Sequence, residues 1–268
     1  MDKKLRQLQL RLLDGLDYID RICTNNNLQY YLIGGTLLGA VRHRGFIPWD
    51  SDIDIALTRE NYHKLVKILK NNAECKYYLL SYEDPDSPVA FSRLLFKNTV
   101  YIKKKCKHEI KYKEIYIDIF PLDYINKYNK IQNKIVEKML YLLQRLKSYR
   151  IGYSDSDSYK SALLLRILNF LILIDNKRIT EVINAIITFN SSRRTKYVTN
   201  YYSHYGCLKE IQRIEDFEQT VLLEFENKLF LAPRNYDRVL RNVYGDYMKL
   251  PDKKHRPAYN WEQYDLTI

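Results

Sequence analysis

The segment that most constrains the fold of this chain is Trp49-Asp50-Ser51-Asp52-Ile53-Asp54-Ile55, where carboxylates alternate with isoleucines. In an extended strand, side chains two residues apart point to the same face. Asp52 and Asp54 are therefore predicted to converge, while Ile53 and Ile55 bury the opposite face. Two adjacent carboxylates repel each other unless a cation lies between them. Because a divalent hard cation meets this need, the segment predicts a metal-binding strand.

A glycine-rich turn precedes this strand. Leu28–Ile33 is typical of a short strand, which ends at Gly34-Gly35-Thr36 before a short helix over Leu37–Val41. The free N–H groups at such a helix start, with the Thr36 hydroxyl, can hold a phosphate. A lone Asp-x-Asp is a weak signal, because most such triplets are solvated loop residues. A phosphate-binding turn followed by a metal-binding pair, however, indicates phosphoryl-group chemistry.

A third carboxylate, Asp118, lies on the polar side of the apolar segment Tyr116–Phe120. We expect it to complete the metal site with Asp52 and Asp54. Asp50 and Asp123 stay outside this predicted catalytic core. Asp50 can form an ion pair with a nearby arginine, and Asp123, which follows a proline, is as typical of a turn as of a ligand.

The remaining pattern predicts an α+β fold with a mixed β-sheet flanked by helices and an inserted, mostly helical lobe. Leucines and isoleucines recur every three or four residues between Leu5 and Ile22, as in an amphipathic helix. We divide the chain into a catalytic core (1–125), a helical lobe (126–210) and a C-terminal segment that returns to the active site (211–268). Predicted strands are Ile53–Leu57, Tyr77–Tyr82, Val89–Phe96, Val100–Lys103 and Ile115–Phe120, and predicted helices are Glu60–Leu69, several within Asn126–Phe189, and Tyr236–Tyr244.

The net charge indicates which kinds of partner to expect, and the cysteine content indicates the compartment. The formal net charge is +12, so an anionic partner is expected, and candidates are nucleic acid, anionic lipid and phosphorylated small molecules. Nucleic acid is not favoured, because the chain shows no nucleic-acid-binding module and the three aspartates would repel a phosphate backbone. Four dispersed cysteines and no evident signal peptide predict a reduced, cytoplasmic protein.

The longest apolar stretch is Ala162–Ile174, too short to cross a bilayer. It can lie at the inner face of a membrane together with Lys103–Lys107, which gives a peripheral membrane contact. Burial in the core is favoured about two to one, because the helix is apolar nearly all round. Two Cys/His pairs, Cys106/His108 and His204/Cys207, match no standard zinc spacing.

Three motifs together resemble the LicD family, within the nucleotidyltransferase fold of polymerase-β type. They are the run from Gly34 to Asp54, Ile117-Asp118-Ile119-Phe120-Pro121-Leu122-Asp123, and the segment from Pro233 to Pro251 with Tyr244-Gly245-Asp246-Tyr247. One departure is Ser51, where the family usually has a further Asp; Ser51 points away from Asp52, so little effect on metal binding is expected. No family motif falls between Asn126 and Ile211.

The resemblance implies a nucleotidyltransferase-like sheet and transfer of a phosphate-linked alcohol, most often phosphocholine from CDP-choline, with release of CMP. The acceptor would be a hydroxyl of a cell-surface glycan such as lipopolysaccharide, teichoic acid or a capsule precursor, free or lipid-linked. Asp52, Asp54 and Asp118 would hold one or two Mg²⁺ or Mn²⁺ ions, and Asp118 would help to deprotonate the acceptor. Alternatives are CDP-ribitol or CDP-glycerol as donor, or a true nucleotidyltransferase that releases pyrophosphate.

Further substrate contacts are expected around this core. Besides Gly34, Gly35 and Thr36, Arg42 and His43 are placed to neutralise diphosphate oxygens, although Arg42 can instead cap its helix. Trp49 either stacks on a base or packs under its loop. In the C-terminal motif, charged residues beside the Tyr-Gly turn are expected to close over the donor or acceptor: Asp246, His255 and Arg256.

Overall fold

A mixed sheet of seven strands forms the centre of the computed structural model, which describes residues 2–72, 76–103, 111–151, 159–171, 173–252, 256 and 261–265. β2 runs parallel to β6, and the other paired strands of this sheet are antiparallel. The long β6 also pairs with β7, which pairs with β8. The strand order is β1 (Tyr31–Leu32), β2 (Asp54–Thr58), β6 (Tyr116–Tyr124), β4 (Ser92–Phe96) and β3 (Tyr77–Leu80). β7 (Tyr197–Thr199) and β8 (Gln212–Arg213) lie off this path. The predicted α+β class with a mixed sheet is confirmed.

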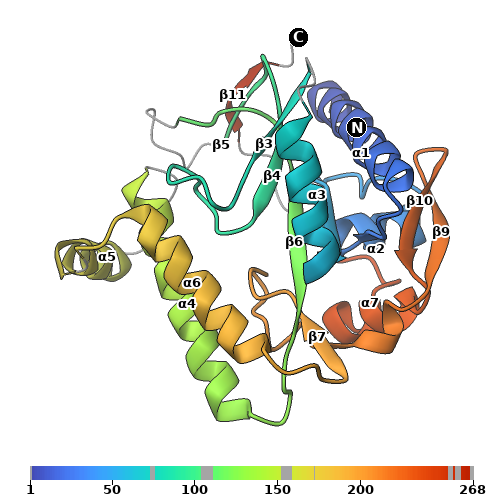
Figure 1. Cartoon of the computed structure of the whole chain (residues 1–268). Coiled ribbons are helices and arrows are strands. Elements are labelled where there is room, and N and C mark those ends of the chain that lie inside the picture. The colour runs from blue at the N-terminus through green and yellow to red at the C-terminus, as the bar shows by residue number, and fades with distance from the viewer. Residues whose placement is uncertain are drawn as a thin grey trace.

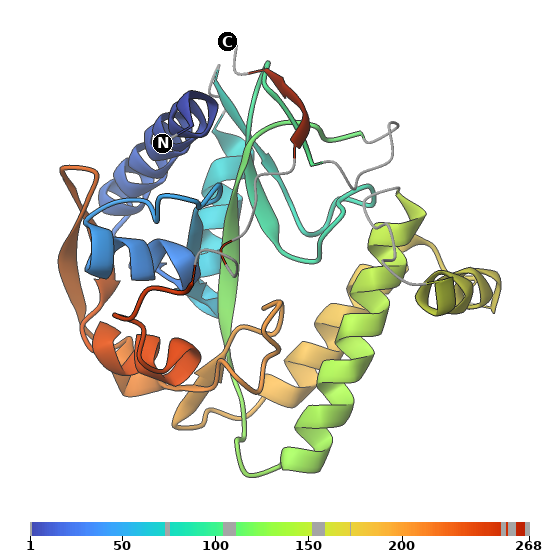
Figure 2. The same ribbon diagram turned by 180° about the vertical axis from the view of Figure 1, so that it is seen from behind.

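Helices α1 (Lys3–Asn25) and α3 (Arg59–Asn71) cover one face of the sheet (Figures 1 and 2). The apolar stripe of α1 is buried as its periodicity predicts. At Gly15 the helix approaches so closely that a Cβ would lie 2.3 Å from Cζ of Phe96 and 2.9 Å from Cδ1 of Ile117. Ile53 and Ile55 are fully buried, which confirms their predicted inward orientation. The polar side chains of β2 and β6 consequently point to the other face.

Asp123 lies within β6, so its prediction as a turn residue or ligand is wrong. Its buried carboxylate forms an ion pair with Arg59, whose Nε donates to Oδ1 at 2.7 Å. The strand continues through Pro121 because β2 and β7 both pair with it there. This ion pair therefore joins the start of α3 to the far end of β6.

The helical lobe consists of α4 (Lys130–Arg150), α5 (Tyr159–Leu171) and α6 (Asn176–Ser191). α4 and α6 lie side by side, and α5 projects away from the body (Figures 1 and 2). Nζ of the fully buried Lys147 in α4 donates to Oγ1 of Thr180 at 2.6 Å and to the carbonyl of Val89 at 3.1 Å. This lysine therefore ties both helices to the loop that leads into β4.

The favoured burial of the apolar helix is wrong. In α5, Leu165 is buried, whereas Leu163, Leu164, Ile167 and Phe170 are exposed. The reason is that α4 and α6 already cover each other, which leaves α5 in contact with the lobe along one side only. Within the described residues, no helix combines the length and apolar character needed to cross a bilayer.

The C-terminal part of the chain returns to the sheet. After a short 3-10 turn (Ile214–Asp216), the hairpin β9 (Thr220–Phe225) and β10 (Lys228–Pro233) packs beside β1. It leads into α7 (Tyr236–Tyr244), which lies against α2 (Gly34–His43). A separate two-stranded sheet joins β5 (Val100–Lys103) to β11 (Trp261–Asp265). The predicted helix Tyr236–Tyr244 is confirmed at both ends.

Candidate active site

A cavity of about 620 Å³ opens on the face of the sheet opposite α1 and α3. Its walls come from the start of α2, the start of β2, the middle of β6, the loop between β7 and β8, and the segment after α7. Its lining includes a carboxylate cluster formed by Asp50, Asp52, Asp54 and Asp118. Segments far apart in the sequence therefore bring the three predicted catalytic aspartates to one place.

Asp54 lies at the centre of this cluster because β2 begins with it and pairs in register with β6. Its strand partner in the parallel ladder is Asp118. Burial raises the pKa of the Asp54 carboxyl well above its usual range, and the charges of Asp52, Asp118 and Asp50 raise it further. Among the described residues, no hydrogen-bond donor contacts the carboxylate of Asp52 or Asp54. Neither carboxylate therefore has an ion-pair partner within the part of the chain that the structure describes.

Asp118 differs from Asp54 because it has a cationic partner. Nε of the buried Arg93, on the neighbouring strand β4, donates to Oδ1 of Asp118 at 2.7 Å. The Arg93 guanidinium also lies 3.9 Å from the ring centroid of Tyr116, which restricts its movement. Arg93 was not predicted as a site residue, because Ser92–Phe96 has no alternation of polar and apolar residues that would mark its orientation.

The first turn of α2 forms a backbone cradle beside these carboxylates. Gly34 has φ +56°, and a Cβ added there would lie 3.2 Å from Oδ2 of Asp54. A Cβ on Gly35 would lie 2.6 Å from Oδ2 of Asp50. The glycines therefore allow the helix start, with its free N–H groups and positive dipole end, to approach the cluster. The helix begins at Gly34, three residues earlier than predicted, because Ile33 serves as its N-cap.

Thr36 has a structural contact instead of lining the cavity. Its buried hydroxyl accepts a hydrogen bond from the backbone N–H of Asp54 at 2.9 Å. The side chain therefore fixes the start of β2 against α2, and through it the position of the Asp54 carboxylate.

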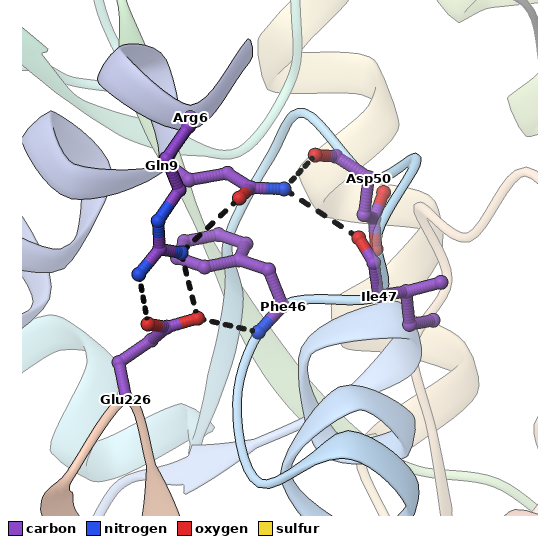
Figure 3. A network of polar contacts seen from close by, with 6 residues as sticks. All are labelled: Arg6, Gln9, Phe46, Ile47, Asp50 and Glu226. Atoms are coloured by element: carbon purple, nitrogen blue, oxygen red, sulfur yellow. Dashed lines mark hydrogen bonds and ion pairs between the residues drawn. The ribbon is translucent and has the colours of Figure 1, made fainter. Parts of the chain in front are cut away.

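The loop that carries Asp50 is held from behind by a network of polar contacts (Figure 3). Nε2 of the buried Gln9 donates to the carbonyl oxygens of Asp50 and Ile47, at 3.0 and 3.5 Å. Arg6 donates to Oε1 of Glu226 at 2.9 Å, and the same oxygen accepts from the N–H of Phe46 at 3.2 Å. Helix α1 and the β9–β10 hairpin therefore fix the backbone on which Trp49 and Asp50 depend.

Basic side chains lie beside the carboxylate cluster, and we call Arg42, His43 and Arg256 the cationic group. Arg42 lines the cavity and donates from Nη1 to the carbonyl of Tyr247 at 2.7 Å, so it connects α2 to the C-terminal segment. Burial and the charge of Arg256 lower the pKa of Arg42. The Arg256 guanidinium lies 4.4 Å from the ring centroid of Trp49, and His43 meets the same ring edge-on. Four predicted substrate contacts are therefore neighbours.

The two other predicted substrate contacts in the C-terminal segment have different outcomes. Asp246 lines the cavity, whereas His255 lies outside the described residues. Of the two Cys/His pairs that match no zinc spacing, Cys106 and His108 also lie outside the described residues, and Cys207 is buried. Of the two arginines that could pair with Asp50, Arg44 pairs with Glu224 at 3.8 Å and Arg42 donates to the carbonyl of Tyr247.

The cavity residues that the sequence did not predict include Tyr205, Glu210 and Tyr244. Glu210 lies in the irregular loop between β7 and β8, and burial raises the pKa of its carboxyl to about 7. The hydroxyl of Ser203 donates to Oε1 of Glu210. No local periodicity or spacing marks Glu210, because only the tertiary fold brings this loop to the aspartates.

A divalent cation fits this arrangement by its chemistry. Within the described part of the chain, no three His, Cys, Asp or Glu side chains are already gathered as ligands. Asp54 nevertheless supplies a half-buried carboxylate to which no described residue donates a hydrogen bond, and the half-buried Asp52 beside it likewise has no such donor. Oxygen ligands of this kind suit Mg²⁺ and Mn²⁺.

Comparison with known proteins agrees with the geometry. Residues 27–144 match the family described as "LicD/FKTN/FKRP, nucleotidyltransferase domain". The chain is 29% identical over 274 residues, 98% of both proteins, to lipopolysaccharide cholinephosphotransferase LicD of Haemophilus influenzae. A stretch of 62 residues is 45% identical to an uncharacterized protein of Rickettsia prowazekii, 23% of each chain. A stretch of 44 residues is 41% identical to ribitol 5-phosphate transferase FKRP of Homo sapiens, 16% of this chain and 9% of that protein.

Proposed function

We propose that this chain, which is similar to the LicD family over residues 27–144 and to a cholinephosphotransferase over 98% of its length, is a phosphotransferase of that family that transfers phosphocholine from CDP-choline to a glycan hydroxyl and releases CMP. The names of the two characterised relatives support phospho-alcohol transfer in glycan decoration. The observation that carries the proposal is the carboxylate cluster at the N-terminus of α2. The parallel β2–β6 pair at the centre of the sheet is in keeping with a nucleotidyltransferase fold.

The donor diphosphate is proposed to bind between the start of α2 and the carboxylate cluster. The free N–H groups of the first turn face this space, and a helix N-terminus favours anions. Asp52 and Asp54, with Asp118, would hold Mg²⁺ or Mn²⁺, which would neutralise the diphosphate and polarise the phosphorus under attack. Gly34 and Gly35 are required there because any side chain would meet Asp54 or Asp50.

The cytidine part is proposed to lie against the cationic group. The Trp49 ring, already paired with the Arg256 guanidinium, offers a flat surface beside a positive charge. Arg42 supplies a second positive charge within the cavity. These three residues can bind CMP both as part of the donor and as the leaving group.

Transfer then requires one bond to form and one to break. The acceptor hydroxyl oxygen attacks the phosphorus that bears the alcohol, the bond from this phosphorus to the bridging oxygen breaks, and that oxygen leaves with CMP. We assign acceptance of the hydroxyl proton to Asp118, which Arg93 holds in place. Most of the rate enhancement comes from positioning and charge neutralisation.

The test is to incubate the protein with Mg²⁺ and CDP-choline, CDP-ribitol, CDP-glycerol or CTP, with and without lipopolysaccharide as acceptor. CMP and pyrophosphate are separated by chromatography. Asp54→Asn is compared with Asp14→Asn, a matched change on the exposed side of α1. CMP from CDP-choline that is lost in Asp54→Asn and kept in Asp14→Asn supports the proposal.

The other outcomes identify the alternatives. CMP from CDP-ribitol or CDP-glycerol alone would keep the reaction class and replace the donor. Pyrophosphate from CTP would make the protein a nucleotidyltransferase. Release of neither product, with acceptor present, would contradict the proposal.

A further inference from the structure

Aromatic rings border the carboxylate cluster inside the cavity. Tyr244 lies close to it, since its hydroxyl is 4.0 Å from a Cβ placed on Gly34. The ring of Tyr205 meets the ring of Tyr244 edge-on, with 5.7 Å between centroids. Phe120 lies two residues after Asp118 on the same face of β6, and both line the cavity. Part of the cavity next to the reacting groups is therefore lined by rings.

Glu210 brings a negative charge to this aromatic part. Its carboxylate is close enough to Asp54, Tyr205 and Tyr244 to affect the ionisation of each. The Ser203 hydroxyl is its hydrogen-bond donor. Lys209 is the positive charge that acts on Glu210, with Nζ 5.0 Å from the ring centroid of Tyr205, but among the described residues no Lys or Arg forms an ion pair with Glu210. A buried carboxylate is costly unless a cation accompanies it, and the proposed substrate can supply that cation.

The chemistry of these walls distinguishes between alcohols. A quaternary ammonium has no N–H group to donate, and it binds to ring faces near a carboxylate. Ribitol and glycerol need several hydrogen-bond partners for their hydroxyls. We propose that Glu210, with the rings of Tyr205 and Tyr244, binds the trimethylammonium group of the donor alcohol. This inference rests on the proposed function and specifies the substrate class of the same site.

Isothermal titration calorimetry with Mg²⁺ tests the inference without an acceptor. The two probes are CDP-choline and its neutral isostere CDP-3,3-dimethylbutanol, which has the same shape without the charge. The wild type is expected to bind CDP-choline about tenfold more tightly than the isostere. Glu210→Gln is expected to remove this difference by weakening only the CDP-choline complex.

Two further variants keep the test decisive. Glu218→Gln removes an exposed carboxylate from the following segment and should leave both affinities unchanged. Tyr205→Leu replaces a 40% exposed ring and should weaken CDP-choline more than the isostere even if Glu210→Gln does not fold. Equal affinity of the wild type for both probes, or equal weakening of both in the variants, overturns the inference. CMP release from a neutral CDP-alcohol would leave the proposed reaction class intact in that case.

The helical lobe carries a second, independent inference. Of the 18 large apolar or aromatic side chains that are exposed in the described residues, 12 lie between residues 126 and 196 of this lobe. They include Phe170 at 81% and Leu173 at 92% exposure, next to the exposed Leu163, Leu164 and Ile167 of the projecting α5. Scattered exposed apolar residues are ordinary, but a concentration on one projecting element indicates an interaction surface.

The charge of the lobe identifies the partner. Residues 126–196 contain 14 Lys and Arg against 5 Asp and Glu, which gives +9 of the net +12 of the chain. Exposed leucines and a phenylalanine in a lobe with a net charge of +9 are suited to the interface of an anionic bilayer. We infer that α5 and Leu173 dock the enzyme onto anionic lipid, and that α5 lies along the membrane surface.

Co-sedimentation with vesicles tests this docking. Binding is expected to vesicles that contain phosphatidylglycerol, to be weak with pure phosphatidylcholine, and to fall at 0.5 M NaCl because salt screens the charges. The double variant Phe170→Ser/Leu173→Ser should bind at least tenfold more weakly, while Leu222→Ser/Leu229→Ser, on the exposed β9–β10 hairpin, should bind as the wild type does. No binding to anionic vesicles, equal loss in both double variants, or a dimer in solution that Phe170→Ser/Leu173→Ser abolishes would overturn the inference.

Discussion

Replacing Asp54 with Asn is expected to make the metal-free protein more stable. The half-buried carboxylate of Asp54 faces Asp118 across the β2–β6 ladder and is further repelled by Asp52 and Asp50. Asparagine has nearly the same shape and no charge, so it removes the repulsion without leaving a cavity. The hydrogen bond to the Thr36 hydroxyl is unaffected, because its donor is the backbone N–H of residue 54 and not the side chain.

The size of the effect follows from the spacing of the strands. Paired strands lie about 5 Å apart, and two unit charges at about 5 Å interact by about 3 kcal/mol at an effective dielectric constant of about 20. Arg93 cancels part of the charge of Asp118, so a net gain of about 1–3 kcal/mol is expected. For a chain of this size, this corresponds to an increase of about 3–9 °C in Tm.

The pH dependence of this gain has a definite sign. The pKa of Asp54 is raised in the folded state, so the wild type loses stability as the pH rises from the unfolded value of about 4 through the folded value. The advantage of Asp54→Asn is therefore absent near pH 4 and grows as the pH rises. Glu210 is present in both proteins, and because its charge also repels Asp54, the substitution removes that repulsion as well.

Differential scanning fluorimetry from pH 4 to pH 8.5 in EDTA, repeated with 10 mM MgCl₂, measures these quantities. With Mg²⁺ the wild type should gain about 2.7 kcal/mol at a concentration of 100 times Kd, whereas Asp54→Asn should gain much less. The Asp14→Asn variant should follow the wild type in both conditions. The reasoning fails if Asp54→Asn melts below the wild type in EDTA at pH 8, or if Mg²⁺ stabilises both proteins equally.

Three further changes test other parts of the site. Arg93→Met leaves the Asp118 carboxylate buried without its cation, so urea unfolding should show a loss of about 3–5 kcal/mol; a loss under 1 kcal/mol would contradict the importance of this pair. Gly35→Ala places a Cβ 2.6 Å from the movable carboxylate end of Asp50, so CMP release should fall at least tenfold while the far-UV circular dichroism spectrum stays native. Burial raises the pKa of Cys207 to about 12, so its thiol should react with DTNB at pH 8 only after denaturation, which peptide mass spectrometry can follow; rapid reaction of the native protein would refute its burial.

The sequence was sufficient for the parts of the site that depend on local patterns. Alternation placed Asp54 and Asp118 on one face of adjacent strands, because strand periodicity determines which side a residue faces; Asp52 also reaches the cavity but lies before β2, which begins at Asp54. It also separated them correctly from Ile53 and Ile55, which are fully buried. The predicted fold class followed from the same alternation and from the 3.6-residue periodicity of the helices.

The remaining features depend on tertiary structure. Glu210 reaches the cavity only because the loop after β7 folds back beside β6, and nothing in its neighbours signals that path. Thr36 has a hydroxyl suited to phosphate, yet the start of β2 lies close enough to use it. The exposure of Phe170 could not be predicted either, because an apolar helix gives the same pattern whether it meets the core or another partner.

Donor and metal binding are expected to be coupled by the charge of the cavity. The carboxylate cluster and Glu210 place five acidic side chains in a cavity that also has to receive an anionic diphosphate. Without a cation the donor meets repulsion from the cluster, and without the donor a cation there has fewer oxygen ligands. Each should therefore raise the affinity of the other by the same factor, as linkage requires. Calorimetry should show CDP-choline binding at least a hundredfold weaker in EDTA than in Mg²⁺, and an equal affinity in both would refute this coupling.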